Sequence, residues 1–340
     1  MEKTNTRGIT IAGSIIVDIV NVIDVYPQKT MLSVIRKSSK AVGGCVPNTI
    51  IDLAKIDGNI PLTAAGLIGN DDNGDFILSE LEKHGIDTSL IDKTEDYVTS
   101  RDYVMNEETS GSRTFFYEPG ANAAYTADDL PERLQCDMFH AGYILLLEEL
   151  DKEDAVYGTK MAKLLFEVQK HGIKTSVDVV SAEGGEFAKK VIPALRYCDY
   201  AFMNEVECCA VTGVSPRNGD GSLNVGNIKR TMSELFGYGV KEKVIVHAAE
   251  GGFMLNADGS FISSGSLILP DGWIAGSVGA GDAYTAACLY GLYNGYDDTE
   301  ILEFASAAAA CNLSAVDSIG GMRSRDEIKR ITARFAKRNI

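Results

Sequence analysis

Histidine is scarce in this sequence, and cysteine shows no metal-binding pattern. The four histidines, at positions 84, 140, 171 and 247, have no metal-ligand spacing to a cysteine or to each other. The seven cysteines are odd in number and no CxxC occurs. We therefore expect reduced cysteines in the core and no structural zinc.

The sequence also lacks long apolar runs, and its 32 basic residues are outnumbered by 48 acidic ones. No segment approaches the length of a transmembrane helix, and the polar start MEKTNTRG lacks the apolar region of a secretory signal, so we expect a cytoplasmic protein. A net charge of −16 argues against nucleic acid or an anionic membrane as a partner, because both are negatively charged. It still allows a local basic pocket for a phosphorylated ligand.

Three catalytic motifs are absent. The lack of GxxxxGK[ST] excludes a P-loop kinase, and the lack of GxSxG argues against an α/β-hydrolase. A nicotinamide dehydrogenase is disfavoured because GAGDAY is not GxGxxG and lies near the C-terminus. The length of 340 residues allows one large or two modest domains.

The most informative segment that is present runs from Gly279 through Ala280 and Gly281 to Asp282. Small residues let this turn approach a ligand, and the following residues are compatible with a helix. The N–H groups and dipole of a helix N-terminus form an anion site. A carboxylate there would repel a phosphate, unless it accepts a proton from a nucleophile that attacks the anion. Taken alone, the motif favours a simpler interpretation, in which Asp282 is a first-turn residue that stabilises the helix.

From about residue 134 the sequence alternates between strand-like and helical segments. We predict strands at 138–147, 173–180, 200–203 and 243–248, and helices at 154–171, 187–195, 205–212 and 227–236. This alternation predicts an α/β fold, with a mostly parallel, doubly wound sheet flanked by helices. Ligands bind beyond the carboxyl ends of the strands in such sheets. Ribbons at 251–269 and helices at 281–294 and 299–314 follow, with a basic C-terminal helix.

One segment breaks the alternation. Residues 97–118 are rich in Val, Thr, Tyr and Phe, with a hairpin turn at NEETSG. Together with 24–42 they predict a small separate sheet. We therefore divide the chain into a main domain of residues 1–23, 43–96 and 119–340 and a β lid of residues 24–42 and 97–118.

The N-terminal part holds two further polar features. Asp18 interrupts an apolar, strand-like run over 8–23, which is costly unless the carboxylate has partners or a task. It could also cap a turn at the end of a strand. Gly43 and Gly44 form a tight turn that leads into a helix from Asn48 to Ile56.

Five motifs stand in one order along nearly the whole chain. They are Gly13 to Asp18, Gly43-Gly44 with Asn48, Gly66 to Gly74, Asn204-x-x-Glu207 and Gly279 to Asp282. This order resembles the ribokinase (PfkB-like) carbohydrate kinase superfamily. The resemblance implies a Rossmann-like, ribokinase-like fold with a β-sheet lid, and ATP-dependent phosphorylation of a primary hydroxyl on a small sugar or sugar derivative. It also implies a possible homodimer through the lid sheet.

The resemblance assigns roles in phosphoryl transfer. Asp282 would be the general base, and the N–H groups of 279–281 would stabilise the γ-phosphoryl, since this chemistry depends on positioning and electrostatics. Asn204 and Glu207 would orient ATP and Mg²⁺, with Glu207 acting through water. The same pair also fits a helix cap. Ala249 and Gly252 follow the strand that would bind the nucleotide.

The resemblance also points to the acceptor site. Asp18, Gly43, Gly44 and Asn48 match its sugar-binding positions, where a carboxylate and an amide can pair with hydroxyls. Three further candidates are Glu148 at a strand end, Arg113 on the lid, and Asn122 after the lid. Arg113 could bind a substrate carboxylate or phosphate, or serve only as an edge-strand charge.

The sequence departs from the family pattern at three places. Gly276-Ser277 stands where Asp-Thr is usual, so a carboxylate-liganded K⁺ site is in question, although carbonyls of the loop before Gly320 could still bind a cation. Ala249 replaces a glycine of the nucleotide strand. The segment from Asp178 to Ser181 lacks the usual Asn and Arg.

Two alternatives remain on the same fold. A nucleoside kinase would need an aromatic base pocket, for which Tyr26, Tyr97, Phe115 and Tyr117 are candidates. A non-catalytic sugar-binding or regulatory protein is the second, because fold does not determine function.

Overall fold

A computed structural model describes residues 7–109, 112–181 and 186–340. The polar start of the chain up to residue 6, and the last two residues of the NEETSG turn, lie outside the described residues. Within them, no helix is long and apolar enough to cross a membrane.

The main body is built on a nine-stranded sheet in the order β15-β14-β13-β12-β11-β8-β1-β4-β5. The seven strands from β13 to β5 are parallel, and β14 and β15 are antiparallel additions at one edge. β1 is buried throughout, as expected of a central parallel strand. The strands are β1 (Ile9–Gly13), β4 (Leu62–Gly69), β5 (Asp87–Thr94), β8 (Met138–Ile144), β11 (Lys174–Val179), β12 (Tyr200–Asn204), β13 (Lys243–Ala248), β14 (Gly251–Asn256) and β15 (Phe261–Gly265).

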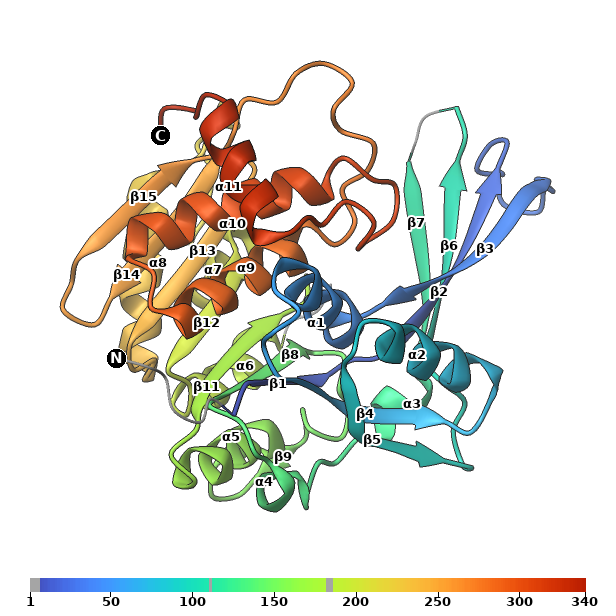
Figure 1. Cartoon of the computed structure of the whole chain (residues 1–340), viewed down its shortest axis with the longest axis horizontal. Helices are drawn as coiled ribbons and strands as arrows, with labels where there is room; N and C mark the ends of the chain where they lie inside the picture. Colours follow the sequence, from blue (N-terminus) through green and yellow to red (C-terminus); the bar gives the residue numbers. More distant parts are fainter. Residues whose placement is uncertain (1–6, 110–111, 182–185) are drawn as a thin grey trace.

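Helices cover both faces of this sheet (Figure 1). One apolar cluster joins the sheet to α1 (Cys45–Ile56), α2 (Asp72–Lys83), α9 (Ala280–Asn294), α10 (Asp298–Asn312) and α11 (Arg325–Arg334). The second joins the opposite face to α4 (Leu130–Arg133), α5 (Lys160–Lys170), α6 (Phe187–Leu195), α7 (Glu205–Thr212) and α8 (Val225–Tyr238). The short α3 (Gly120–Ala124) packs on β4. The predicted doubly wound α/β architecture is therefore confirmed.

A four-stranded sheet in the order β3-β2-β6-β7 stands out from one side of the main body (Figure 1). Its strands are β2 (Ile16–Ile23), β3 (Ile35–Gly43), β6 (Arg101–Glu107) and β7 (Arg113–Glu118). The ranges that we predicted for the lid contain β6, β7 and nearly all of β3. β2 also belongs to this sheet, although we placed its residues in the main body.

The N-terminal run over 8–23 is two strands rather than the single strand that we predicted. β1 ends at Gly13, whose φ is 137°, and β2 begins three residues later in the other sheet. Glycine adopts such a backbone without strain. The apolar pattern continues across the break because both strands are buried, so periodicity could not reveal it.

A second difference lies at 154–171, which we predicted to be one helix. The structure has a small hairpin of β9 (Glu153–Asp154) and β10 (Gly158–Thr159) before α5 begins at Lys160. The Asp154 carboxylate accepts the N–H groups of Val156 and Tyr157, and Thr159 caps α5. These local side-chain bonds compete with the helix. We also made no prediction for β5.

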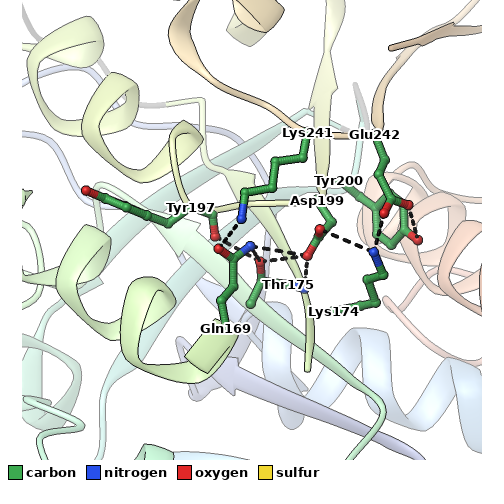
Figure 2. Close-up of polar contacts among 8 residues, drawn as sticks. All are labelled: Gln169, Lys174, Thr175, Tyr197, Asp199, Tyr200, Lys241 and Glu242. Carbon is green, nitrogen blue, oxygen red and sulfur yellow. Dashed lines mark hydrogen bonds and ion pairs between the residues drawn. The ribbon is translucent and has the colours of Figure 1, made fainter. Parts of the chain in front are cut away.

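The amino ends of the parallel strands are closed by a polar network (Figure 2). Asp199, which is buried, accepts hydrogen bonds from the N–H of Thr175 at 2.8 Å and from Gln169 at 3.3 Å. Tyr200 donates to Glu242 at 2.9 Å, and Lys174 pairs with the same carboxylate. The polar groups at this end are engaged with one another, whereas open cavities lie at the carboxyl ends.

Candidate active site

The GAGD turn is the start of helix α9, as predicted. Gly279 is its N-cap and has a left-handed backbone with φ 78°. A Cβ at this position would lie 2.4 Å from the Ser318 carbonyl oxygen, so only glycine fits. The first N–H groups of a helix have no partner within it. Gly279, Gly281 and Asp282 line a cavity of about 240 Å³ at this end of α9.

Asp282 is buried in the first turn of α9 and is held by two side chains. Asn48 donates its amide N–H to Oδ2 at 2.8 Å. The Tyr143 hydroxyl donates to Oδ1 at 3.0 Å and to Oδ2 at 3.1 Å. Burial and the neighbouring Asp178 raise the pKa of Asp282 to about 7, while the two hydrogen bonds oppose the rise. The carboxyl is thus able to exchange a proton near neutral pH.

Asn48 reaches Asp282 because its own amide oxygen is fixed from the other side. The Ser318 hydroxyl donates to Asn48 Oδ1 at 2.8 Å. Asn48 lies in the first turn of α1, whose N-cap Gly44 has φ 83°. The structure therefore brings Asn48, four residues after Gly44, into contact with Asp282, which lies 234 positions further along the sequence.

Tyr143 is a site residue that we did not predict, as are Asp178 and His247. It lies at the carboxyl end of β8 with a positive φ of 61°, which is unusual for a residue other than glycine. Its N–H donates to Asp178 Oδ1 at 2.6 Å, and its hydroxyl reaches Asp282. The sequence offered one indication of this role: Tyr143 lies near the carboxyl end of a predicted strand, and ligands bind beyond such ends in parallel sheets.

Asn204 and Glu207 form the predicted capping box of α7. The N–H of Asn204 donates to one Glu207 oxygen at 2.9 Å, and Ser181 donates to the other at 2.7 Å. Burial is the main cause that raises the pKa of Glu207 to about 7. Both residues line the 240 Å³ cavity together with Asp178 and Asp282.

These residues fit Mg²⁺ that is bound through water. Both Glu207 oxygens already accept hydrogen bonds, so direct coordination would disrupt the capping box. Mg²⁺ retains several waters and takes oxygen ligands, including substrate phosphates. Within the part of the chain that the structure describes, no group of three or more His, Cys, Asp or Glu could hold a metal ion.

A second cavity, of about 400 Å³, lies on the other side of the α9 N-terminus. It is lined by Ala249, Gly251, His247, Ala280 and Gly281, among others. Ala249, directly after β13, is therefore at the edge of a cavity. Gly252 does not line this cavity. It packs against Tyr284, because a Cβ at position 252 would lie 2.0 Å from the Tyr284 hydroxyl oxygen. Gly251 lines the cavity instead.

His247 borders both cavities from the end of β13. Its ring is tilted against Tyr284, with ring centroids 5.1 Å apart. Burial lowers the pKa of His247 to about 4, so the ring is neutral at neutral pH.

A third cavity, of about 540 Å³, lies between the lid and the main body. Asp18 and Arg113 line it from the lid, and Val316 to Gly320 from the body. Gly43 packs against the Asp18 carboxyl, which a Cβ would approach to 2.3 Å. Burial, then the neighbouring Asp102 and Asp282, raises the pKa of Asp18 to about 8. The predicted acceptor residues Asp18 and Arg113 thus line one cavity, and Gly43 lies directly behind the Asp18 carboxyl without lining it.

The other candidates have different surroundings. Glu148 is exposed and lines none of these three cavities. Asn122 is fully buried and accepts the Ile15 N–H at 3.0 Å, so it ties the turn between β1 and β2 to the segment after the lid. Gly276 faces the carbonyl oxygens of Ala315 and Val316, which a Cβ would approach to 2.8 and 3.0 Å. An aspartate therefore could not replace Gly276 without a backbone shift.

Fold and site together define a class of protein. A doubly wound sheet carries a lid, and a buried carboxyl at a helix N-terminus lines one cavity. Another cavity lies under the lid, and a further one adjoins the same helix N-terminus at Ala280 and Gly281. This is the arrangement of a small-molecule phosphotransferase, in which an acceptor and a nucleotide approach one anion site from two sides.

The chain matches the pfkB family of carbohydrate kinases over residues 9–325, and it belongs to that family. It is 24% identical over 309 residues to the aminoimidazole riboside kinase of Salmonella typhimurium, covering 88% of each chain. It is 27% identical over 311 residues to the 5-dehydro-2-deoxygluconokinase of Shouchella clausii, covering 86% of this chain and 87% of that protein.

Among solved structures, the ribokinase of Arabidopsis thaliana complexed with ribose and ATP is similar with a TM-score of 0.79 and 20% identity, covering 98% of this chain and 100% of that one. The ribokinase of Thermotoga maritima is similar with a TM-score of 0.73 and 20% identity, covering 96% and 99%. These likenesses confirm the predicted ribokinase-like fold. Family membership identifies the chain as an ATP-dependent sugar or nucleoside kinase, so the non-enzymatic alternative is set aside.

Proposed function

We propose that the chain transfers the γ-phosphoryl group of ATP to a primary hydroxyl of a small sugar or sugar derivative, with Asp282 as the general base. The observation that carries this proposal is the buried Asp282 carboxyl at the N-terminus of α9, held by Asn48 and Tyr143. A pKa of about 7 suits a base that must take a proton and release it at neutral pH.

The proposed reaction transfers the γ-phosphoryl group of ATP to the acceptor hydroxyl in one step. Asp282 accepts the hydroxyl proton, and the hydroxyl oxygen forms a bond to the γ-phosphorus of ATP. The bond from that phosphorus to the bridging oxygen breaks, and ADP leaves with the electron pair. The N–H groups of residues 279–281 stabilise the charge on the γ-phosphoryl group, which is where such a reaction needs it.

Most of the other predicted site residues have supporting roles in this proposal. Asn204 and Glu207 would hold water-bound Mg²⁺, which neutralises phosphate charge when present. Ala249 and its neighbours in the 400 Å³ cavity would receive the nucleotide. Asp18, next to Gly43, would pair with acceptor hydroxyls. The exposed position of Glu148 gives it no contact with the three cavities.

A riboside is the second candidate acceptor. Of the four aromatic residues that we considered for a base pocket, Phe115 lines the lid cavity beside Val20 and Val104. About half of the Phe115 side chain is exposed, so its ring is free to stack on a base. One relative is named for an aminoimidazole riboside.

A coupled assay of ADP release tests the proposal. Purified protein with ATP and Mg²⁺ would be screened against pentoses, hexoses, keto-sugar acids, inositols and nucleosides, with Asp282→Asn as the matched control. We expect turnover of one acceptor class by the natural protein and none by the variant. Turnover by Asp282→Asn at a near-normal rate would contradict the role of Asp282.

A further inference from the structure

The inner face of the lid sheet is graded in polarity from its base to its tip. Side chains two residues apart on a strand share a face, and register aligns them across strands. Three successive rows of this face are Ala41-Asp18-Asp102-Tyr117, then Ser39-Val20-Val104-Phe115, then Lys37-Val22-Asn106-Arg113. The base of the lid is thus acidic, its middle is mainly apolar and its tip is basic.

The basic row faces the 540 Å³ cavity. Lys37 and Arg113 line this cavity from the tip row, and Lys40 and Lys55 line it from the edge of β3 and from α1. The chain has 48 acidic residues against 32 basic ones. Even so, within residues 7–109, 112–181 and 186–340, none of these four cations forms an ion pair with a carboxylate.

Three of these cations donate hydrogen bonds to neutral groups. Lys40 donates to the Asn73 amide oxygen at 2.7 Å, Lys55 to the Ile319 carbonyl at 2.7 Å and Arg113 to the Val316 carbonyl at 2.9 Å. A guanidinium has five N–H donors, so Arg113 keeps donors for a ligand. A carboxylate or phosphate can engage such a fork with two parallel hydrogen bonds.

Three carboxyl groups, of Asp18, Glu80 and Asp317, line the same cavity and could offset its positive charge. Asp317 accepts the N–H groups of Ile319 and Gly320, and Glu80 pairs with Lys83 at 2.5 Å. The raised pKa of Asp18 leaves it mostly protonated near neutral pH. The charge of Glu80 is therefore balanced by Lys83, the Asp317 carboxylate is held by the N–H groups of its own loop, and Asp18 contributes little negative charge.

The spacing of the rows places the basic end away from Asp282. Four residues separate the Asp18 row from the Lys37 row, which is about 13 Å along an extended strand. The Arg113 side chain shortens this span, because its guanidinium reaches Val316, two residues before the Ser318 that holds Asn48. The short segment from Val316 to Ser318 thus contacts Arg113 directly, and it contacts Asp282 through Asn48.

We propose that the acceptor carries an anionic group, a carboxylate or a phosphate ester, at the end away from the phosphorylated hydroxyl, and that Arg113 binds this group, with Lys37 adding positive charge from the opposite edge of the same row. The inference rests on the proposed function, which supplies the direction of the hydroxyl. The lid then contributes charge recognition as well as a cover, and neutral sugars bind less tightly because they leave the cations without a partner.

The test compares matched acceptors and variants. The acceptors are sugar acids (gluconate and its keto-deoxy derivatives), hexose monophosphates, and the neutral sugars fructose and ribose. The variants are Arg113→Gln and Lys37→Gln, with Arg36→Gln as control. Arg36 precedes Lys37 on β3 but pairs with Asp24 at 2.6 Å and does not line the cavity.

We expect Arg113→Gln to raise the KM for the anionic acceptor by about ten- to a hundredfold with little change in kcat, because a bond to a charged group in the ground state is lost. Arg36→Gln should leave that KM unchanged. The sugar-acid and hexose-phosphate arms distinguish a carboxylate from a phosphate ester. Equal kcat/KM for anionic and neutral acceptors, unaffected by Arg113→Gln, would overturn the inference while the proposed kinase activity stood.

A binding measurement covers the case in which no acceptor is turned over. Thermal shift with each acceptor, in the presence of ADP, reports binding without chemistry. Stabilisation of the natural protein by a sugar acid or sugar phosphate, lost in Arg113→Gln, would support the inference even if the proposed reaction failed. Stabilisation by neutral sugars only, or by none of these ligands, would overturn it.

Discussion

Tyr143→Phe should move the pH dependence of the reaction without removing the base. The Tyr143 hydroxyl donates to both oxygens of Asp282, at 3.0 and 3.1 Å, and this bond favours the ionised carboxylate. A hydrogen bond to a charged group contributes about 1.5–3 kcal/mol, which corresponds to roughly 1–2 pKa units. The substitution keeps the ring and deletes only the hydroxyl. The pKa of Asp282, about 7 in the natural protein, should therefore rise.

The assay is kcat/KM measured against pH. The base acts when deprotonated, so activity should rise with pH, along an acid limb with an apparent pKa near 7 in the natural protein. In Tyr143→Phe this limb should move to higher pH by about 1–2 units, and most of the activity should return at alkaline pH. Asp282→Asn should show no recovery at any pH. An acid limb that stays in place, or moves to lower pH, would refute the reasoning.

The remaining predictions concern the anion site and stability. Gly279→Ala should lose activity and about 1–2 kcal/mol of stability, because its left-handed backbone disfavours a side chain. Gly281→Ala, whose Cβ would meet its nearest neighbour at 3.5 Å, should fold normally in the same urea titration. Asp199→Ala should cost about 1–3 kcal/mol in urea unfolding with unchanged KM, because it leaves the buried Thr175 N–H unpaired. Since the folded-state pKa of Asp282 is raised from 3.8 to about 7, unfolding free energy should fall as pH rises through this range, and Asp282→Asn should flatten that fall. The predicted dimer through the lid would give a dimeric mass in light scattering, and a monomer would discard it.

Much of the fold could be predicted because its signals are local. Alternation of apolar strands and amphipathic helices indicated the parallel sheet, and the predicted bounds of α6, α7 and β13 agree with the structure. The break between β1 and β2 could not be seen, because a strand that crosses from one buried setting to another shows no change in hydrophobicity. The β9–β10 hairpin depends on the side-chain bonds of Asp154, which compete with a helix that the composition also allows.

The site was predictable where a motif carries backbone geometry. Gly279 and Gly44 each have a positive φ that a glycine signals in the sequence. Tyr143 was missed because its role depends on the approach of β8 to α9, which are about 140 positions apart in the sequence. The charge gradient of the lid was hidden for the same reason, since it depends on the register of four strands. Gly276 departs from the family pattern, and its packing against Ala315 and Val316 gives a steric account of that departure.

The role of Asp282 is the central claim, and single-turnover phosphoryl transfer by Asp282→Asn tests it most directly. The variant would be mixed with saturating ATP, Mg²⁺ and the acceptor found in the screen, and its affinity for ATP would be measured by calorimetry. We predict a loss of at least about a hundredfold in the transfer rate, as expected for removal of a general base, with ATP affinity essentially unchanged. Transfer close to the natural rate, at any pH, would contradict the account.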